Sequence, residues 1–318
     1  MDERVRGRSA HSPSPGRVAP KKPANLAGRI LASCLPAAIS TAVLSVFSPA
    51  LAAASQTLVH GLWVWKTLSV LQAPEGPEKL RDFCLRNHVS EVYLSVSERA
   101  TTLEDHHLTD LVGTLHRSGL QVDALLSSPD ADEPGRPREK LLDEARQVLS
   151  FNKRHPECSF DGIHLDIEPQ QREENKGEGN LRFLPGLVAA YRAMLQLTGS
   201  ERIGLNADIA RKFLKGGLEE RRMLLSALPR LTLMLYELGS PNDLESAAKR
   251  VEKLQKATQE SFQEAYAGLD DINLARLGIG LRTPDYGELL PRMLQTLDDA
   301  NRTNPHYLGW GWHSYNDH

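Results

Sequence analysis

From residue 58 to its end, the sequence alternates short β-branched or aromatic runs with longer amphipathic segments. Eight runs have the length and composition of buried strands, at 58–66, 89–97, 120–127, 161–168, 202–209, 231–237, 275–282 and 306–313. The segments between them carry apolar residues at three- and four-residue spacing, which predicts helices. Strand–helix alternation implies parallel strands joined by crossover helices, and it constrains the fold more than any other feature of the chain.

Eight strand–helix units fit a (β/α)8 barrel, or TIM barrel, whose usual length is about 250 residues. The competing architecture is an open, doubly wound sheet, which usually carries a Gly-x-Gly-x-x-Gly loop after its first strand. Here the turn after the first strand reads KTLSVLQAPEG and lacks that motif. We therefore expect residues 55–318 to form one (β/α)8 barrel domain.

Residues 1–54 differ in composition from the rest. Residues 1–26 are rich in Ser, Pro, Arg and Lys without an apolar period, which predicts disorder, and an apolar run follows that ends in Ala-Leu-Ala at 50–52. A basic flank, an apolar core and an Ala-x-Ala end are typical of a secretory signal peptide. An uncleaved membrane anchor is the alternative, because about 20 apolar residues span a bilayer. Pro36, Pro49 and the small-residue end favour cleavage, and hence a secreted or periplasmic protein.

Removing the basic leader leaves an acidic domain. Residues 1–52 hold seven Lys or Arg and two acidic residues, a net of +5, so the remainder carries −8 against −3 for the whole chain. Such a domain is a poor candidate for binding nucleic acid. We expect a monomer without a cofactor, whose only membrane contact is the leader if that is not cleaved. Cys84 and Cys158 could pair in an exported protein, but the sequence does not show whether they do.

Catalytic groups of this fold lie at the carboxyl ends of the strands. The candidates at these ends are Trp65, Asp166, Glu168, Asn206, Asp208, Tyr236, Glu237, Arg282, Trp310 and Trp312. Sugars stack their apolar faces on aromatic rings, and their hydroxyls need directional polar partners. Acids, an amide, a phenol and indoles that converge on one mouth therefore predict a carbohydrate substrate.

The fourth strand, DGIHLDIEP at 161–169, carries the reactive groups in this prediction. Residues two apart share one face of a strand, so His164, Asp166 and Glu168 point the same way. Neighbouring carboxyls cannot both ionise cheaply, so the pKa of one is raised, as a general acid near neutral pH requires. Glycoside cleavage needs such an acid and a second group that stabilises the sugar cation. His164 lies deepest, and we expect it to be a hydrogen-bonded core partner.

This strand resembles the signature D-G-x-D-x-D-x-E of the family-18 glycoside hydrolases, the chitinases and their relatives. Asp161, Asp166 and Glu168 fall in register, and His164 stands in place of the middle aspartate. MLYE at 234–237 is similar to the sixth-strand motif M-x-Y-D of that family. A tryptophan on the last strand, Trp310 or Trp312, also fits the family.

The resemblance implies roles for three residues. Glu168 would donate the proton, Asp166 would orient the N-acetyl group of the substrate as it attacks the anomeric carbon, and Tyr236 would hydrogen-bond that group. The third-strand motif S-x-G-G of the family is absent, and LLSSPD stands in its place. A retaining mechanism with Asp208 or Glu237 as nucleophile therefore stays open.

Two other classes of protein are compatible with the pattern. His164, Asp166 and Glu168 could bind a divalent metal, as in phosphodiesterase barrels, although the first strand ends in WVWK without a pair of metal ligands. A chitinase-like sugar-binding protein without catalysis is the third class, and retention of Glu168 argues against it. The sequence thus predicts an exported glycoside hydrolase with no metal site, with Glu168 as general acid and Asp166 as its partner.

Overall fold

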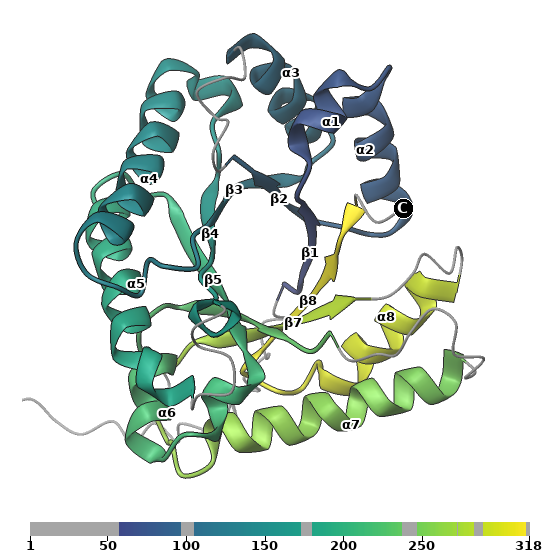
Figure 1. Cartoon of the computed structure of the whole chain (residues 1–318). Helices are drawn as coiled ribbons and strands as arrows, with labels where there is room; N and C mark the ends of the chain where they lie inside the picture. The colour runs from purple at the N-terminus through teal and green to yellow at the C-terminus, as the bar shows by residue number, and fades with distance from the viewer. Residues whose placement is uncertain are drawn as a thin grey trace, which may run out of the picture. The chain divides into compact units, whose positions relative to one another are not determined.

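The computed structural model describes residues 57–96, 105–172, 180–236, 247–271, 273–282 and 289–315. Eight parallel strands close into a barrel in chain order, and the helices surround it (Figure 1). The predicted (β/α)8 barrel is therefore confirmed. The predicted disordered segment and signal peptide lie outside the described residues and stay predictions.

All eight predicted strands are present. They are β1 Val59–Val64, β2 Glu91–Ser95, β3 Gln121–Ser127, β4 Gly162–Asp166, β5 Gly204–Ala210, β6 Arg230–Met234, β7 Arg276–Arg282 and β8 Tyr307–His313. Four of them, β1, β2, β4 and β6, end two or three residues earlier than expected, at Val64, Ser95, Asp166 and Met234. Glu168 and Tyr236 therefore lie in the segments that follow these strands, on the side of the barrel where the carboxyl ends meet, which we call the mouth.

Helices connect the strands on the outside. They are α1 Thr67–Gln72, α2 Gly76–Arg86, α3 Asp105–His116, α4 Arg136–Arg154, α5 Leu184–Thr198, α6 Leu218–Leu225, α7 Ala247–Tyr266 and α8 Leu289–Asn301, with short 3-10 turns η1 Pro156–Cys158, η2 Pro169–Gln171, η4 Asn180–Phe183 and η5 Arg211–Lys215. None of the helices in the described part of the chain is long and apolar enough to cross a membrane. Cys84 and Cys158 are both free thiols.

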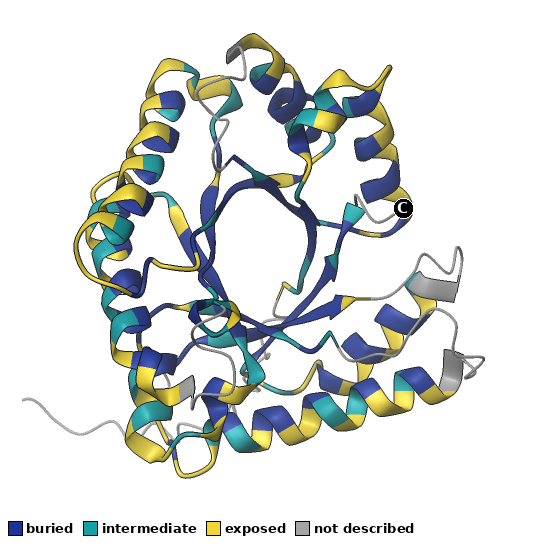
Figure 2. Cartoon of the chain, in the orientation of Figure 1, coloured by how far each residue is buried: buried dark blue, intermediate teal, exposed yellow. Residues whose placement is uncertain are grey.

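The main hydrophobic core lies between the outer face of the barrel and the helices (Figure 2). On α4 the buried residues Leu141, Ala145 and Val148 recur every three or four positions, so one stripe of the helix packs inward. On the strands alternate residues face this layer, as Ile163 and Leu165 do on β4. The period of two therefore assigns the other residues of each strand to the barrel interior.

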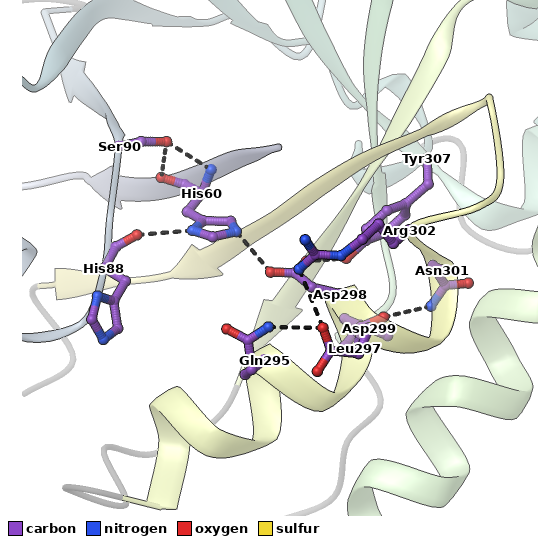
Figure 3. A network of polar contacts seen from close by, with 10 residues as sticks. All are labelled: His60, His88, Ser90, Gln295, Leu297, Asp298, Asp299, Asn301, Arg302 and Tyr307. Atoms are coloured by element: carbon purple, nitrogen blue, oxygen red, sulfur yellow. Dashed lines mark hydrogen bonds and ion pairs between the residues drawn. The ribbon is translucent and has the colours of Figure 1, made fainter. Parts of the chain in front are cut away.

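A polar network joins β1, β8 and α8 on the outside of the barrel wall (Figure 3). Nε2 of His60 lies 2.8 Å from Oδ2 of Asp298, and its Nδ1 lies 2.9 Å from the carbonyl oxygen of His88. The Tyr307 hydroxyl donates to Oδ1 of Asp298 at 2.7 Å, and the His60 ring stacks on Trp310. His60 thus fastens α8 to the start of β1 and is not available to the mouth.

Two aromatic rings fill the upper interior of the barrel. Trp63 on β1 and Tyr93 on β2 are buried and meet edge to face, with centroids 5.1 Å apart. Glycines occupy the inward positions beside them. A Cβ on Gly311 would lie 2.4 Å from the Trp63 ring, and one on Gly61 would lie 2.5 Å from the Tyr93 hydroxyl oxygen. These close approaches require glycine because a closed eight-stranded barrel has little interior space.

The lower interior is polar. Glu91 forms an ion pair with Arg230 near the starts of β2 and β6. Nδ2 of Asn206 donates to Oδ2 of Asp123 at 2.8 Å. Burial, together with the charge of Glu91, raises the pKa of Asp123 well above its usual value. Polar side chains thus continue from the floor of the barrel up to the mouth.

The glycine at 311 gives a direct test of this packing. We expect Gly311→Ala to lower the free energy of unfolding by about 1–3 kcal/mol, because its new methyl group overlaps the Trp63 ring. Gly278→Ala is the matched control, since its Cβ would meet only ordinary contacts from 3.4 Å outward. Urea unfolding measures both, and equal stability of Gly311→Ala and wild type would contradict the packing described.

Candidate active site

Strand β4 brings two carboxyl groups to the mouth. Asp166 ends the strand with its side chain buried, and Glu168 lies two residues further on with its side chain partly exposed. The turn η2 begins directly after Glu168, at Pro169. The structure therefore places both predicted acids at one strand end and gives them different access to solvent.

Asp166 is held against β3. Its register partner is Ser127, whose hydroxyl donates to Oδ2 at 3.4 Å. The pKa of Asp166 is raised well above its usual value by burial, and further by the negative charges of Asp208 and Glu168. Because the serine hydrogen bond opposes these effects only in part, Asp166 ionises less readily than an ordinary aspartate.

Glu168 is held by the turn that follows it. Nε2 of Gln170 donates to Oε1 at 3.0 Å, and Nε2 of Gln171 donates to Oε2. Burial raises the pKa of Glu168, while the Gln171 hydrogen bond and the positive charge of Lys212 oppose the rise. A fixed, partly exposed carboxyl with a raised pKa can carry a proton and give it to a ligand at the mouth.

The loop after Glu168 is fastened by Arg172. Its guanidinium donates to Oε1 of Glu133 at 2.7 Å and to Oδ2 of Asp132 at 3.3 Å, both in the segment after β3. With these acidic partners, Arg172 supports the glutamine turn.

Asp208 on β5 lies beneath the mouth and is only 1% exposed. Nε1 of Trp63 donates to its Oδ2 at 3.0 Å, and Nε2 of His164 lies 2.9 Å from its Oδ1. The Tyr191 hydroxyl donates to its backbone oxygen at 3.2 Å. Burial raises the pKa of Asp208 well above its usual value, in part offset by the Trp63 hydrogen bond.

Two predicted substrate contacts are therefore corrected. Trp63 and His164 enclose the Asp208 carboxyl, and Asn206 lies one layer deeper against Asp123 with 3% of its surface exposed. Both residues point into the barrel as the strand period requires, but neither reaches the mouth surface. The alternation of side chains along a strand predicts on which face of the sheet a residue lies, but not how deep in the barrel it lies.

An aromatic wall faces the carboxyls. It consists of Trp65 after β1, Tyr236 after β6 and His313 at the end of β8. Nε1 of Trp65 donates to Nε2 of His313 at 2.8 Å, and the Tyr236 and His313 rings lie 5.0 Å apart between centroids. Burial and the charges of Asp208, Asp166 and Glu168 raise the pKa of Tyr236. Trp65 and Tyr236 thus lie where the sequence predicted, and His313 joins them.

Trp310 and Trp312 do not belong to this wall, which corrects a second prediction. Trp310 stacks on His60, and the Trp312 ring lies 5.1 Å from the ring of Phe83 on α2. Both face the helices, because the inward positions of β8 are the glycines and His313. The sequence GWGWH contained the signal for this arrangement, since its parity puts the histidine and the tryptophans on opposite faces.

Two predicted site residues remain, Arg282 and Glu237. Arg282 ends β7 with an exposed side chain, and its charge lowers the pKa of Tyr236. Glu237 lies outside the described residues. Within the described ranges, no group of three or more His, Cys, Asp or Glu is arranged to hold a metal ion. His164 is fully buried below the mouth, so it does not form a ligand set with Glu168.

No protein-family model and no curated protein sequence matches the chain. Solved structures with a similar fold include an Ostrinia furnacalis Group IV chitinase in complex with allosamidin, at 11% identity and a TM-score of 0.47 over 71% of this chain and 66% of that one. The spore cortex-lytic enzyme SleL of Bacillus megaterium matches at 11% identity and 0.49, over 82% and 71%. The PgaB (BpsB) glycoside hydrolase domain of Bordetella bronchiseptica matches at 13% and 0.46, over 81% and 94%.

This chain thus spans slightly less than two thirds of the length of the Ostrinia furnacalis chitinase. These likenesses concern the fold, and a fold hosts many chemistries. What the site does is therefore argued from its own residues.

The hydrogen bond from Gln171 gives a test of the pKa of the Glu168 carboxyl. We expect Gln171→Ala to raise the pKa of Glu168 further, because the variant removes a donor that favours the ionised form. Gln263→Ala on the exposed face of α7 is the matched control. A carboxyl-carbon NMR titration measures the shift, and a lowered pKa in Gln171→Ala would contradict this view of the site.

Proposed function

We propose that the protein is a glycoside hydrolase that cleaves an oligo- or polysaccharide at the mouth of the barrel. The observation that carries the proposal is the pair Asp166 and Glu168, one buried and one partly exposed, opposite an aromatic wall. Both carboxyls have a raised pKa, and Glu168 is the more exposed of the two. A site of this kind pairs a proton donor with a second carboxyl, as glycoside cleavage requires.

Glu168 is the general acid in this proposal. Burial disfavours the charge of its carboxyl and raises its pKa, which favours the protonated form, and Gln170 and Gln171 fix its orientation. The proton passes to the glycosidic oxygen as the bond to the leaving sugar breaks. A positioned acid of this type contributes about 10²–10⁴ to the rate.

Asp166 is the partner group. When ionised, it stabilises the positive charge that develops at the anomeric centre or on an N-acetyl group of the substrate. Tyr236 lies within electrostatic range of both carboxyls and offers a hydroxyl to the same part of the substrate. Of the two alternative nucleophiles, Asp208 is enclosed by Trp63 and His164, which disfavours attack by its carboxylate.

The aromatic wall supplies the sugar platform. Trp65 is partly exposed, and its orientation is fixed by the hydrogen bond to His313. A ring fixed in this way can stack on the apolar face of a sugar at little cost in side-chain entropy. Arg282 at the rim completes the set of proposed binding residues. Export to the periplasm or the exterior rests on the leader sequence alone and belongs to this proposal.

The decisive variant is Glu168→Gln, which removes the proton and keeps the shape of the side chain. We expect turnover of a cleavable glycan to fall by about 10²–10⁴ while the unfolding temperature and glycan binding stay near those of wild type. Glu219→Gln, on the exposed side of α6, is the matched control. Full activity in Glu168→Gln would refute the assignment. Glycan binding without hydrolysis of any member of a glycan panel, by wild type itself, would indicate a sugar-binding protein instead.

Chelation separates this proposal from a metal-dependent phosphodiesterase. We expect glycan hydrolysis to be unchanged after dialysis against EDTA, because the proposed chemistry uses only carboxyl groups. Loss of activity that returns on addition of Mg²⁺, Mn²⁺ or Zn²⁺ would favour the metal-dependent alternative. The same preparations, assayed against bis-(p-nitrophenyl) phosphate, give a second readout for that alternative.

A further inference from the structure

The histidine of the aromatic wall holds the tryptophan on which a sugar would stack. Nε1 of Trp65 donates to Nε2 of His313 at 2.8 Å, and the two rings lie 5.8 Å apart between centroids. The Trp65 ring also packs against the buried cluster of Trp63, Tyr93 and Leu125. One hydrogen bond and one apolar contact therefore determine how the partly exposed indole is oriented.

A bulge in β8 turns the His313 side chain into the barrel. Tyr307, at the start of the strand, faces outward, because its hydroxyl donates to Oδ1 of Asp298 on α8. In a regular strand His313, six residues later, would lie on the same outward face as Tyr307. The pairing of β8 with β7 shifts by one residue directly after Tyr307, and His313 consequently faces Trp65 at the mouth.

Glycine at position 309 makes this bulge possible. Its φ of 134° lies in a region that L side chains rarely adopt, and a Cβ there would overlap the carbonyl oxygen of Val59 on β1. Bulges are frequent beside active sites, where they redirect a side chain. The direction of the His313 side chain is therefore set by the backbone of β8 as well as by its ring contacts.

The hydrogen bond also determines where the imidazole carries its proton. An indole N–H can only donate, so Nε2 of His313 accepts with its lone pair and carries no hydrogen. The ring is then neutral, with its one proton on Nδ1. Protonation of Nε2 would place two N–H groups against each other and break the contact with Trp65.

We propose that His313 is a positioning residue for the sugar: as a neutral imidazole it holds the Trp65 platform, and sugar affinity falls when Nε2 is protonated. This inference rests on the proposed function, because the platform matters only if a sugar stacks on it. His313 acts on substrate binding through Trp65, and the proton transfer from Glu168 does not involve it.

Titratable and charged groups from other strands surround His313, so its protonation depends on theirs. They are Arg282 on β7, which is its register partner, Tyr236 after β6, whose ring centroid lies 5.0 Å from that of His313, and the carboxyls of Asp166, Glu168 and Asp208, whose charges reach Tyr236. From β1 and the residue after it, the uncharged indoles of Trp63 and Trp65 lie beside the ring. The midpoint of a pH effect therefore belongs to the whole site, and the test is whether the effect requires a protonable ring at position 313.

Replacing His313 separates binding from chemistry. His313→Leu removes the acceptor, so we expect KM to rise about fivefold to tenfold while kcat stays within about threefold of wild type. His313→Gln keeps an acceptor oxygen for the Trp65 N–H and should return KM toward the wild-type value. His107→Gln on the exposed face of α3 is the matched control. An unchanged KM in a folded His313→Leu, or an equally high KM in His313→Gln, would overturn the proposal.

The pH dependence of binding tests the need for a neutral ring. The probe is the N-acetylglucosamine pentamer, bound to Glu168→Gln so that neither turnover nor that carboxyl contributes. We expect its affinity to fall about fivefold from about pH 7.5 to 5, and by less than about twofold when His313→Gln is added, since an amide does not titrate. An equal fall in the two proteins would overturn the proposal.

An NMR measurement without sugar tests the contact itself and does not depend on activity. The indole N–H signal of Trp65, assigned from its loss in Trp65→Phe, should be protected from solvent exchange in wild type and His313→Gln and unprotected in His313→Leu. The Trp63 indole, bonded to Asp208, reports whether each variant is folded. Equal protection of the Trp65 signal in wild type and in folded His313→Leu would overturn the proposal. If wild type binds and hydrolyses no glycan, the proposed function fails, and the indole signal still decides whether His313 holds Trp65.

Discussion

The carboxyl groups of Asp166 and Asp208 lose their water shell when eight strands close around them. A buried carboxylate costs several kcal/mol unless it is paired or neutral, and the interior offers no free cation among the described residues to pair with it. The barrel can therefore tolerate very little net negative charge on its three neighbouring acids, Asp166, Glu168 and Asp208. The positions of Trp63, His164 and the glutamines beside Glu168 all follow from this constraint.

Glycine at inward positions makes this arrangement possible. Gly61 and Gly311 leave room for the rings of Tyr93 and Trp63, and the Trp63 indole can then cross the interior to reach Asp208. Packing and electrostatics are coupled here, because the side chain that fills the space also donates the hydrogen bond that supports the buried acid.

Much of this organisation could be predicted from the sequence. The alternation of strands and helices determined the barrel, and the fourth-strand pattern placed Asp166 and Glu168 at its mouth. The depth of a side chain below the mouth, and the face of the strand on which it lies, were harder to predict. Asp208 shares the inward face but lies one layer too deep to meet a ligand, and the tryptophans of GWGWH face the helices while His313 faces the site. The supports for Glu168 and Asp208 could not be predicted, because side chains from other segments supply them only after folding.

The chemistry of the site depends most on where the protons of its acids lie, and neutron diffraction from deuterated crystals at about pH 5 shows this directly. The predicted nuclear density has one deuteron on the Glu168 carboxyl and one on the Asp208 carboxyl, because burial raises the pKa of both groups. A bare Glu168 carboxylate would contradict its assignment as the general acid.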